Sequence, residues 1–177
     1  HISMRVLPLK IYVSTQSGRR YVMGWFFKAK RIIFCRLDNL EQVLEPKDLP
    51  DYDKFLAQAE EMEQHLWGVS VNIPLGEGKS SLDHVELVVR AGEEKPYILR
   101  CLEREKRCGK VTKLAEGRYQ FTADVRDAGG MLPWLRTFIG RIESFTCSNK
   151  KIEELFWQDL EAVYAMYGLS KVGDGHE

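Results

Sequence analysis

The sequence predicts an α+β protein of two small units joined by a helix, and three observations lead to this fold class. Residues 7–46 contain short segments rich in β-branched and aromatic residues, which are typical of antiparallel strands. Residues 46–68 then change to an apolar pattern of helical period. Residues 83–147 follow the order strand, helix, strand, strand, helix, strand, which is that of a ferredoxin-like unit. A chain of 177 residues, 44% hydrophobic and 29% charged, is long enough for both units.

The first unit, residues 1–48, is predicted to be a small β-barrel. Strands are expected over 7–15, 19–27 and 31–38, with a tight turn at "KAKR", and a short strand over 39–46. Such a meander of short antiparallel strands is typical of small barrels. Because four strands are few for closure, we expect a further strand before residue 1, which would make the chain part of a longer protein.

A strongly acidic helix is predicted to connect the two units. Its apolar positions recur at helical spacing, and they are Phe55, Leu56, Ala59, Met62 and Leu66. Gly68 is suited to end the helix. Asp51 and Asp53 lie near its start, where capping of backbone N–H groups explains carboxylates. We therefore interpret residues 49–81 as a connector helix and linker.

The second unit is predicted over residues 82–170. Its elements are a strand over 83–91, a helix over 94–105, a hairpin over 109–125, a helix over 129–140 and a strand over 141–147. A last helix follows, with Ser148 or Asn149 at its N-cap and Gly168 at its end. Its apolar stripe consists of Ile152, Leu155, Phe156, Leu160, Val163, Tyr164 and Tyr167. This aromatic stripe either packs on the sheet or is shared with a second subunit, and residues 171–177 are expected to be frayed.

Basic residues are concentrated at the start of the chain, although the net charge is zero. Residues 1–37 contain eight of the 26 lysines and arginines and no acid, whereas all 26 acids follow with the other 18 cations. A local excess of positive charge attracts anionic partners. Two explanations stay open: the basic segment binds an anionic ligand, or it packs against the acidic remainder of the chain.

The usual signatures of enzymes and metal sites are missing from the sequence. His1, His65, His84 and His176 lie far apart and lack the spacing of a metal site. "LGEGKSS", residues 75–81, lacks the first glycine of a phosphate-binding loop and is interpreted as a linker turn. No Ser/His/Asp set or nucleophile elbow is found. We therefore predict no catalytic residues, no metal and no other cofactor.

Cysteine usage and hydropathy predict a cytoplasmic location without membrane contact. The four cysteines form no CxxC pair and are interpreted as reduced structural thiols; they are Cys35, Cys101, Cys108 and Cys147. The first residues lack the apolar core of a signal peptide. No apolar run approaches the roughly 20 residues of a membrane span.

"GRRYVMGWFFKAKRIIFCRLDNL", residues 18–40, combines cations and aromatic residues in strand-like alternation. A two-residue turn at "KAKR" would place Tyr21 opposite Asp38 and diagonal to Arg36. One face of this hairpin would then consist of Tyr21, Met23, Trp25, Phe34 and Arg36. The other face or its rim would hold Arg20, Lys28 and Arg31.

A guanidinium on such an aromatic face needs an anionic partner, because burying it unpaired is costly. The anionic partner of Arg36 is either Asp38, in a structural ion pair, or the phosphate or carboxylate of a bound ligand. The cations nearby favour a ligand, and aromatic residues beside arginines suit stacked bases. The predicted ligand-binding residues are Tyr21, Arg36, Arg20, Arg19, Trp25, Lys28, Lys30 and Arg31, with Asp38 as structural partner.

"PLKIYVSTQSGRRYVMGWFFKAKRIIFCRLDNLEQV", residues 8–43, resembles the WYL domain of bacterial transcriptional regulators. The shared features are a proline-containing strand, a glycine turn, and an "RLD" strand that ends in a hydrophobic-x-x-Val segment. At the Trp-Tyr-Leu positions this chain has Arg20, Tyr21 and Val22, so the tyrosine alone matches strictly. Residues 83–167 resemble the extension called WCX that often follows WYL domains.

The resemblance implies an Sm-like, SH3-type β-barrel (WYL) followed by a ferredoxin-like domain (WCX) with a C-terminal helix. It implies a ligand-sensing role in which single-stranded nucleic acid or a nucleotide meets Tyr21 and Arg36. It also implies a homodimer, and binding of duplex DNA through a helix-turn-helix or winged-helix domain ahead of the barrel. Arg20 at the tryptophan position favours an anion.

The leading hypothesis is a sensor module that binds an anionic, nucleic-acid-derived ligand and controls a DNA-binding domain. Tyr21 and Arg36 would hold the ligand, while the other cations supply field and phosphate contacts. Two alternatives stay open. The chain is a protein-interaction or dimerisation module in which Arg36 pairs structurally with Asp38, or it senses a small carboxylate or phosphate metabolite.

Overall fold

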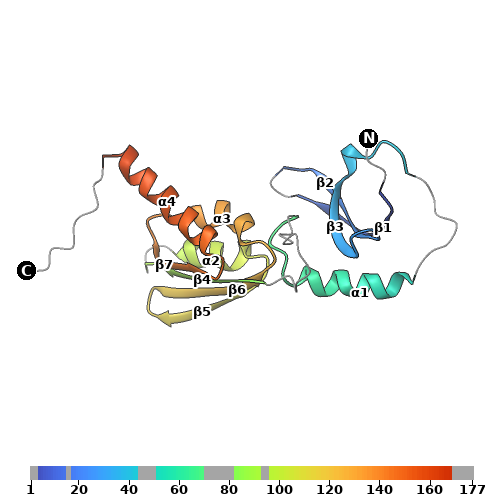
Figure 1. Cartoon of the computed structure of the whole chain (residues 1–177). Helices are drawn as coiled ribbons and strands as arrows, with labels where there is room; N and C mark the ends of the chain where they lie inside the picture. The colour runs from blue at the N-terminus through green and yellow to red at the C-terminus, as the bar shows by residue number, and fades with distance from the viewer. Residues whose placement is uncertain (1–3, 15–16, 44–50, 70–81, 93–95, 169–177) are drawn as a thin grey trace, which may run out of the picture.

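The computed structural model describes residues 4–14, 17–43, 51–69, 82–92 and 96–168. These residues form two antiparallel sheets and four α-helices, an α+β architecture (Figure 1). Within the described ranges, no helix is both long and apolar enough to cross a bilayer.

The first sheet is a meander of three antiparallel strands in the order β1-β2-β3. Its strands are β1 (Val6–Val13), β2 (Arg20–Phe26) and β3 (Arg31–Arg36). β-Branched and aromatic residues make up at least half of each strand, as strands favour. The predicted barrel stays a prediction, because the described residues show one sheet with a helix on one face.

The predicted pairing within the β2–β3 hairpin is wrong by two residues. A two-residue turn placed Tyr21 opposite Asp38, whereas the structure pairs Tyr21 with Arg36. Residues 27–30 form a longer turn, in which Lys30 has a φ of 49°. A shift of two positions leaves every side chain on its predicted face, because side chains alternate along a strand.

The predicted short strand over residues 39–46 is also wrong in its described part. The chain leaves β3 in a 3₁₀ turn, η1 (Leu37–Asn39), closed by the Leu40 N–H donating to the Leu37 carbonyl at 3.2 Å. Residues 40–43 are not in a strand, and residues 44–46 lie outside the described residues. Aspartate and asparagine favour turns over ladders, which explains why pairing ends here.

The first core lies between this sheet and α1 (Tyr52–Glu63), which runs along one face (Figure 1). Its buried members are Leu7, Leu9, Met23, Ile32, Ala59 and Leu66. β1 approaches β2 closely at Gly24, where an added Cβ would lie 2.5 Å from Val6 Cγ1 and 2.7 Å from the Leu7 carbonyl oxygen. The acidic helix predicted as a connector therefore also covers the sheet.

The second sheet has four antiparallel strands in the order β5-β6-β4-β7. Along the chain, its elements are β4 (Asp83–Arg90), α2 (Pro96–Glu105), β5 (Lys110–Ala115), β6 (Arg118–Val125), η2 (Ala128–Met131), α3 (Leu132–Arg136), β7 (Ile142–Cys147) and α4 (Lys150–Met166). The helix predicted over residues 129–140 is shorter than expected, since a 3₁₀ turn precedes α3 and turns follow it.

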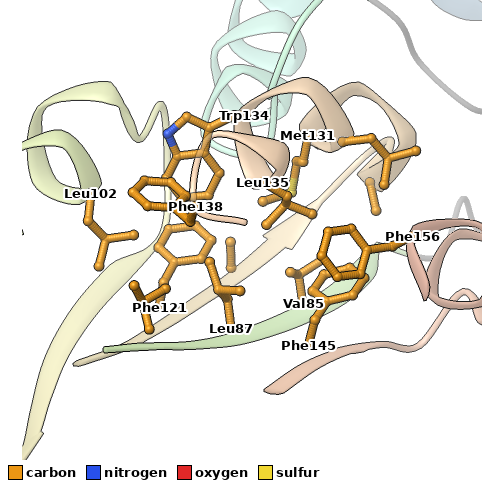
Figure 2. Packing of buried hydrophobic residues seen from close by; sticks show 14 of the residues in the cluster. Val85, Leu87, Leu102, Phe121, Met131, Trp134, Leu135, Phe138, Phe145 and Phe156 are labelled. Carbon is orange, nitrogen blue, oxygen red and sulfur yellow. The ribbon is translucent and has the colours of Figure 1, made fainter. Parts of the chain in front are cut away.

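Aromatic and aliphatic side chains together fill the second core (Figure 2). Trp134 contacts Phe121 and Phe138 edge-on, with ring centroids 5.2 and 5.1 Å apart. Phe145 of β7 and Phe156 of α4 meet at 4.7 Å, and this contact fixes the first half of α4 to the sheet. Beyond it α4 extends away from the sheet (Figure 1), with Tyr167 75% exposed.

Two neighbouring residues after α1 belong to different cores. Leu66 is buried in the first core and Trp67 in the second, where Trp67 packs on Trp134 with ring centroids 4.8 Å apart. Just before them, the His65 carbonyl accepts from the Arg126 N–H at 2.9 Å. The end of α1 is therefore fastened to both units at once.

Candidate ligand site

Three side chains form a row across the first sheet. The register places Tyr12 of β1 opposite Tyr21 of β2, and Tyr21 opposite Arg36 of β3. All three are half-buried and share the face that α1 covers. We call them the Tyr–Tyr–Arg row. Directly opposed residues have Cβ atoms about 5 Å apart, so the two predicted residues Tyr21 and Arg36 are direct neighbours.

Arg36 is paired with Asp38. Its Nε donates to Asp38 Oδ1 at 3.0 Å, and a terminal guanidinium nitrogen contacts the other carboxylate oxygen. The hydrogen bonds raise the pKa of Arg36 and hold the pKa of Asp38 below its usual value. The arginine side chain is 34% exposed and the aspartate 56%, so solvent screens the pair and an incoming anion has access to it.

At the other end of the row lies a group that the sequence did not reveal. Lys10 Nζ donates to Glu63 Oε2 at 2.7 Å, and the Tyr12 hydroxyl donates to Glu63 Oε1. Glu60 lies 3.5 Å from the same ammonium. These carboxylates raise the pKa of Lys10. No local motif could disclose this group, because Glu63 is 53 positions from Lys10 and belongs to the helix predicted as a connector.

Most of the predicted aromatic floor is covered by α1. Trp25 packs on Phe55 of α1 with ring centroids 4.8 Å apart, and Met23 is fully buried. Phe34 contacts Tyr12 edge-on at 5.4 Å. The surface left for stacking is therefore at the tyrosine end of the face, beyond the covered tryptophan.

The remaining predicted cations fall into two groups. Arg19 and Arg20 are exposed next to the Tyr–Tyr–Arg row, and the charge of Arg19 helps to lower the pKa of Asp38. Lys28, Lys30 and Arg31 lie at the turn end of the hairpin. Six strand positions separate Tyr21 from that turn, which corresponds to about 20 Å. One small ligand cannot contact both groups.

Other candidate chemistry is limited in the part of the chain that the structure describes. There, no group of three or more His, Cys, Asp or Glu side chains is arranged to hold a metal ion. All four cysteines are free, and burial raises the pKa of Cys35, Cys108 and Cys147, which makes these thiols poorer nucleophiles. The "LGEGKSS" loop lies outside the described residues.

Similarity between this chain and known proteins is found among solved structures. No protein-family model and no curated protein matches the chain. The solved structure of proteasome accessory factor B/C (PafBC) of Arthrobacter aurescens is similar, with a TM-score of 0.39 and 14% sequence identity. The similarity covers 92% of this chain and 22% of that chain, so this chain spans about a fifth of that protein's length. Functional conclusions therefore depend on the residues of the first sheet.

Proposed function

We propose that this chain is the ligand-sensing module of a WYL-type transcriptional regulator, and that it binds an anionic, nucleic-acid-derived or nucleotide ligand at Tyr21 and Arg36. The observation that carries the proposal is the direct pairing of these two residues in a segment that has eight cations and no acid. An arginine presents a planar fork that matches a phosphate, and a neighbouring tyrosine offers a stacking face.

The surroundings of the row support a phosphate-bearing ligand. Arg19 and Arg20 are exposed beside it and add positive field, which steers anions towards the site. Asp38 holds Arg36 in place through two contacts, so the guanidinium is oriented before a ligand arrives. Lys28, Lys30 and Arg31 are too far away for a mononucleotide, but an oligonucleotide that follows the hairpin reaches them.

The finer fold assignment belongs to the same proposal. The second unit has the element order β-α-β-β-α-β and the strand order β5-β6-β4-β7, which support a ferredoxin-like, WCX-type domain. The three-stranded antiparallel meander, with its close approach of β1 and β2 at Gly24, supports an Sm-like, WYL-type barrel for the first unit.

Fluorescence anisotropy with short single-stranded DNA and RNA at several salt concentrations tests this proposal. We expect saturable binding that weakens as salt rises, because phosphate contacts release counterions. Arg36→Ala should abolish most of the binding. Arg136→Ala is a matched control, since that arginine is similarly exposed and pairs with Asp159 in the second unit. Absence of binding at low salt, or equal binding by both variants, would contradict the proposal.

A small carboxylate or phosphate metabolite is the second candidate ligand. Arg36 in the row and Lys10 beside it already hold the carboxylates of Asp38 and Glu63, so the site accommodates compact anions. Saturable binding of mononucleotides or dicarboxylates without binding of oligonucleotides would favour this candidate.

We also propose that two copies of the chain associate as a homodimer. The second half of α4 supports this, since Tyr164, Met166 and Tyr167 are 44, 82 and 75% exposed. Residues 152–168 contain four acidic residues and no lysine or arginine, whereas residues 1–37 contain eight lysines and arginines and no acidic residue. Two of these acids are already in ion pairs, Glu153 with Lys150 and Asp159 with Arg136, so the exposed aromatic and methionine side chains carry this proposal.

A further inference from the structure

We infer that Lys10 and Tyr12 form an anion subsite, that the Glu63 carboxylate is its resident occupant, and that an anionic group of the ligand replaces Glu63 there. This inference deepens the proposed function and rests on it for the second half of the site, at Tyr21 and Arg36. It assigns binding roles to two side chains, Lys10 and Tyr12, that the sequence pattern left out.

The contacts of Glu63 are those of a bound anion. One carboxylate oxygen accepts from an ammonium at 2.7 Å and the other accepts from the phenol hydroxyl. A phosphate or carboxylate oxygen of a ligand offers the same acceptors in the same geometry. The donors therefore fit either an internal or an external anion.

The occupant is replaceable because the pair is open to solvent. The side chains of Lys10 and Glu63 are 29% and 31% exposed. Ion pairs at such positions are screened by water and salt and hold their partners weakly. A ligand that carries more negative charge than one carboxylate competes well for the same ammonium.

The subsite is continuous with the proposed ligand site. Tyr12 faces Tyr21 directly, and Tyr21 faces Arg36, so donors run without interruption from β1 to β3. Two strand spacings separate the ends of the row, about 10 Å. The site is therefore suited to a ligand with two anionic groups at that separation, such as the phosphates of a short single strand or the carboxylates of an extended diacid.

Replacement of Glu63 would change the junction between the units. Glu63 is the last residue of α1, and the His65 carbonyl, two residues later, accepts from the Arg126 N–H. The His65 ring Nδ1 also lies 2.8 Å from the Asp124 carbonyl oxygen. An anion that frees the end of α1 from the first sheet thus acts on a segment that is fixed to β6. This gives ligand binding a direct route to the second unit.

The test compares anion affinity of the full chain and its Glu63→Gln variant. The probes are a fluorescein-labelled oligothymidylate and inorganic pyrophosphate. We expect Glu63→Gln to bind both probes about two- to fivefold more tightly, because the internal competitor has lost its charge. Glu61→Gln is the matched control, since it makes the same change of charge on an exposed side chain of the same helix and should gain much less affinity.

Two further measurements keep the test decisive. Tyr12→Phe should weaken pyrophosphate binding in the Glu63→Gln background, because it removes one donor and leaves the ring packing in place. Hydrogen exchange of the Arg126 amide should accelerate when the oligonucleotide binds to the unmodified chain, as the junction loosens. Thermal unfolding of each variant verifies that it is folded.

The outcomes separate the inference from the proposed function. If the unmodified chain binds the oligonucleotide through Arg36 and Glu63→Gln binds no more tightly than Glu61→Gln, the subsite is overturned and the proposed function stands. If no variant binds either probe, both are overturned. Tighter binding by Glu63→Gln that depends on the Tyr12 hydroxyl establishes the subsite.

Discussion

Gly24 shows at the residue scale how the first sheet depends on a missing side chain. The ideal Cβ position lies 2.5 Å from a methyl group of Val6 and 2.7 Å from the Leu7 carbonyl oxygen. A methyl group of Val6 can rotate away, but the backbone oxygen cannot move without shifting β1. Close packing of these two strands is therefore possible with glycine alone.

Gly24→Ala is expected to lower the free energy of unfolding by about 1–3 kcal/mol, the usual cost of overpacking. Urea denaturation measures it. Gly130→Ala is the control, since nothing lies within 4 Å of its added Cβ. Equal stability of the two variants would show that β1 does not approach β2 this closely.

His84 provides a second prediction at the residue scale. Its Nδ1 lies 2.7 Å from Asp124 Oδ1 and its Nε2 lies 3.3 Å from Glu86 Oε1 on the open face of the second sheet. Hydrogen bonds to the two carboxylates raise the pKa of His84 above its ordinary 6.5. The protonated ring is thus favoured in the folded state, and its contribution to stability is complete below pH 6.5 and is lost as the pH rises through the raised pKa.

An NMR titration of the His84 ring protons measures this pKa directly. The midpoint should lie above 6.5 in the unmodified chain and fall towards that value in Asp124→Asn, which removes the first of the two carboxylates. An unchanged midpoint in Asp124→Asn would show that the carboxylate does not hold the ring.

At the scale of elements, local sequence patterns predicted the features that depend on neighbouring residues, namely the positions of strands and helices and the faces of their side chains. Alternation of apolar residues placed β1, β2 and β3 within a residue or two of their bounds, and helical spacing placed α4. Helical spacing also found α1, but the predicted end at Gly68 is wrong, because the helix ends at Glu63 and Leu66 lies beyond it. The same alternation put Tyr21 and Arg36 on one face, because face depends on parity alone. Tyr21 and Arg36 could therefore be placed on one face from the sequence.

The failures at this scale arise from contacts that the sequence does not encode locally. The register of a hairpin depends on the length of its turn. Here the turn is longer than predicted, and in it Lys30 adopts a left-handed backbone conformation, which lysine rarely does and which the sequence does not signal. The Lys10–Glu63 contact joins residues 53 positions apart. Helical period showed which residues of α1 are apolar, but not that they face Trp25 and Met23 across the first core.

The junction after α1, at Leu66 and Trp67, connects the two units of the molecule. Because Leu66 and Trp67 are buried in separate cores, the two units should unfold together. Trp67→Ala is expected to destabilise the second unit by about 3–5 kcal/mol and to split urea unfolding into two transitions. Circular dichroism together with tryptophan fluorescence detects the splitting.

Leu102→Ala is the control for the junction. Leu102 is buried in the second core on α2, so its loss should cost about 2–5 kcal/mol while the junction stays intact. A single transition at a lower urea concentration is expected for this variant. Two transitions in Leu102→Ala, or one in Trp67→Ala, would mean that the Leu66–Trp67 pair does not couple the units.

At the scale of the whole molecule, the second half of α4 exposes large apolar side chains that a second copy of the chain would bury. Leu160, Tyr164 and Tyr167 continue the stripe that begins with buried Phe156, so the helix is patterned for contact beyond its own sheet. If a second copy covers this stripe, Tyr164→Lys should shift the protein from dimer to monomer in light scattering coupled to size-exclusion chromatography. Tyr97→Lys is the matched control, because Tyr97 on α2 is 46% exposed against 44% for Tyr164. A dimer that survives Tyr164→Lys, or a monomer before any substitution, would remove α4 as the contact surface.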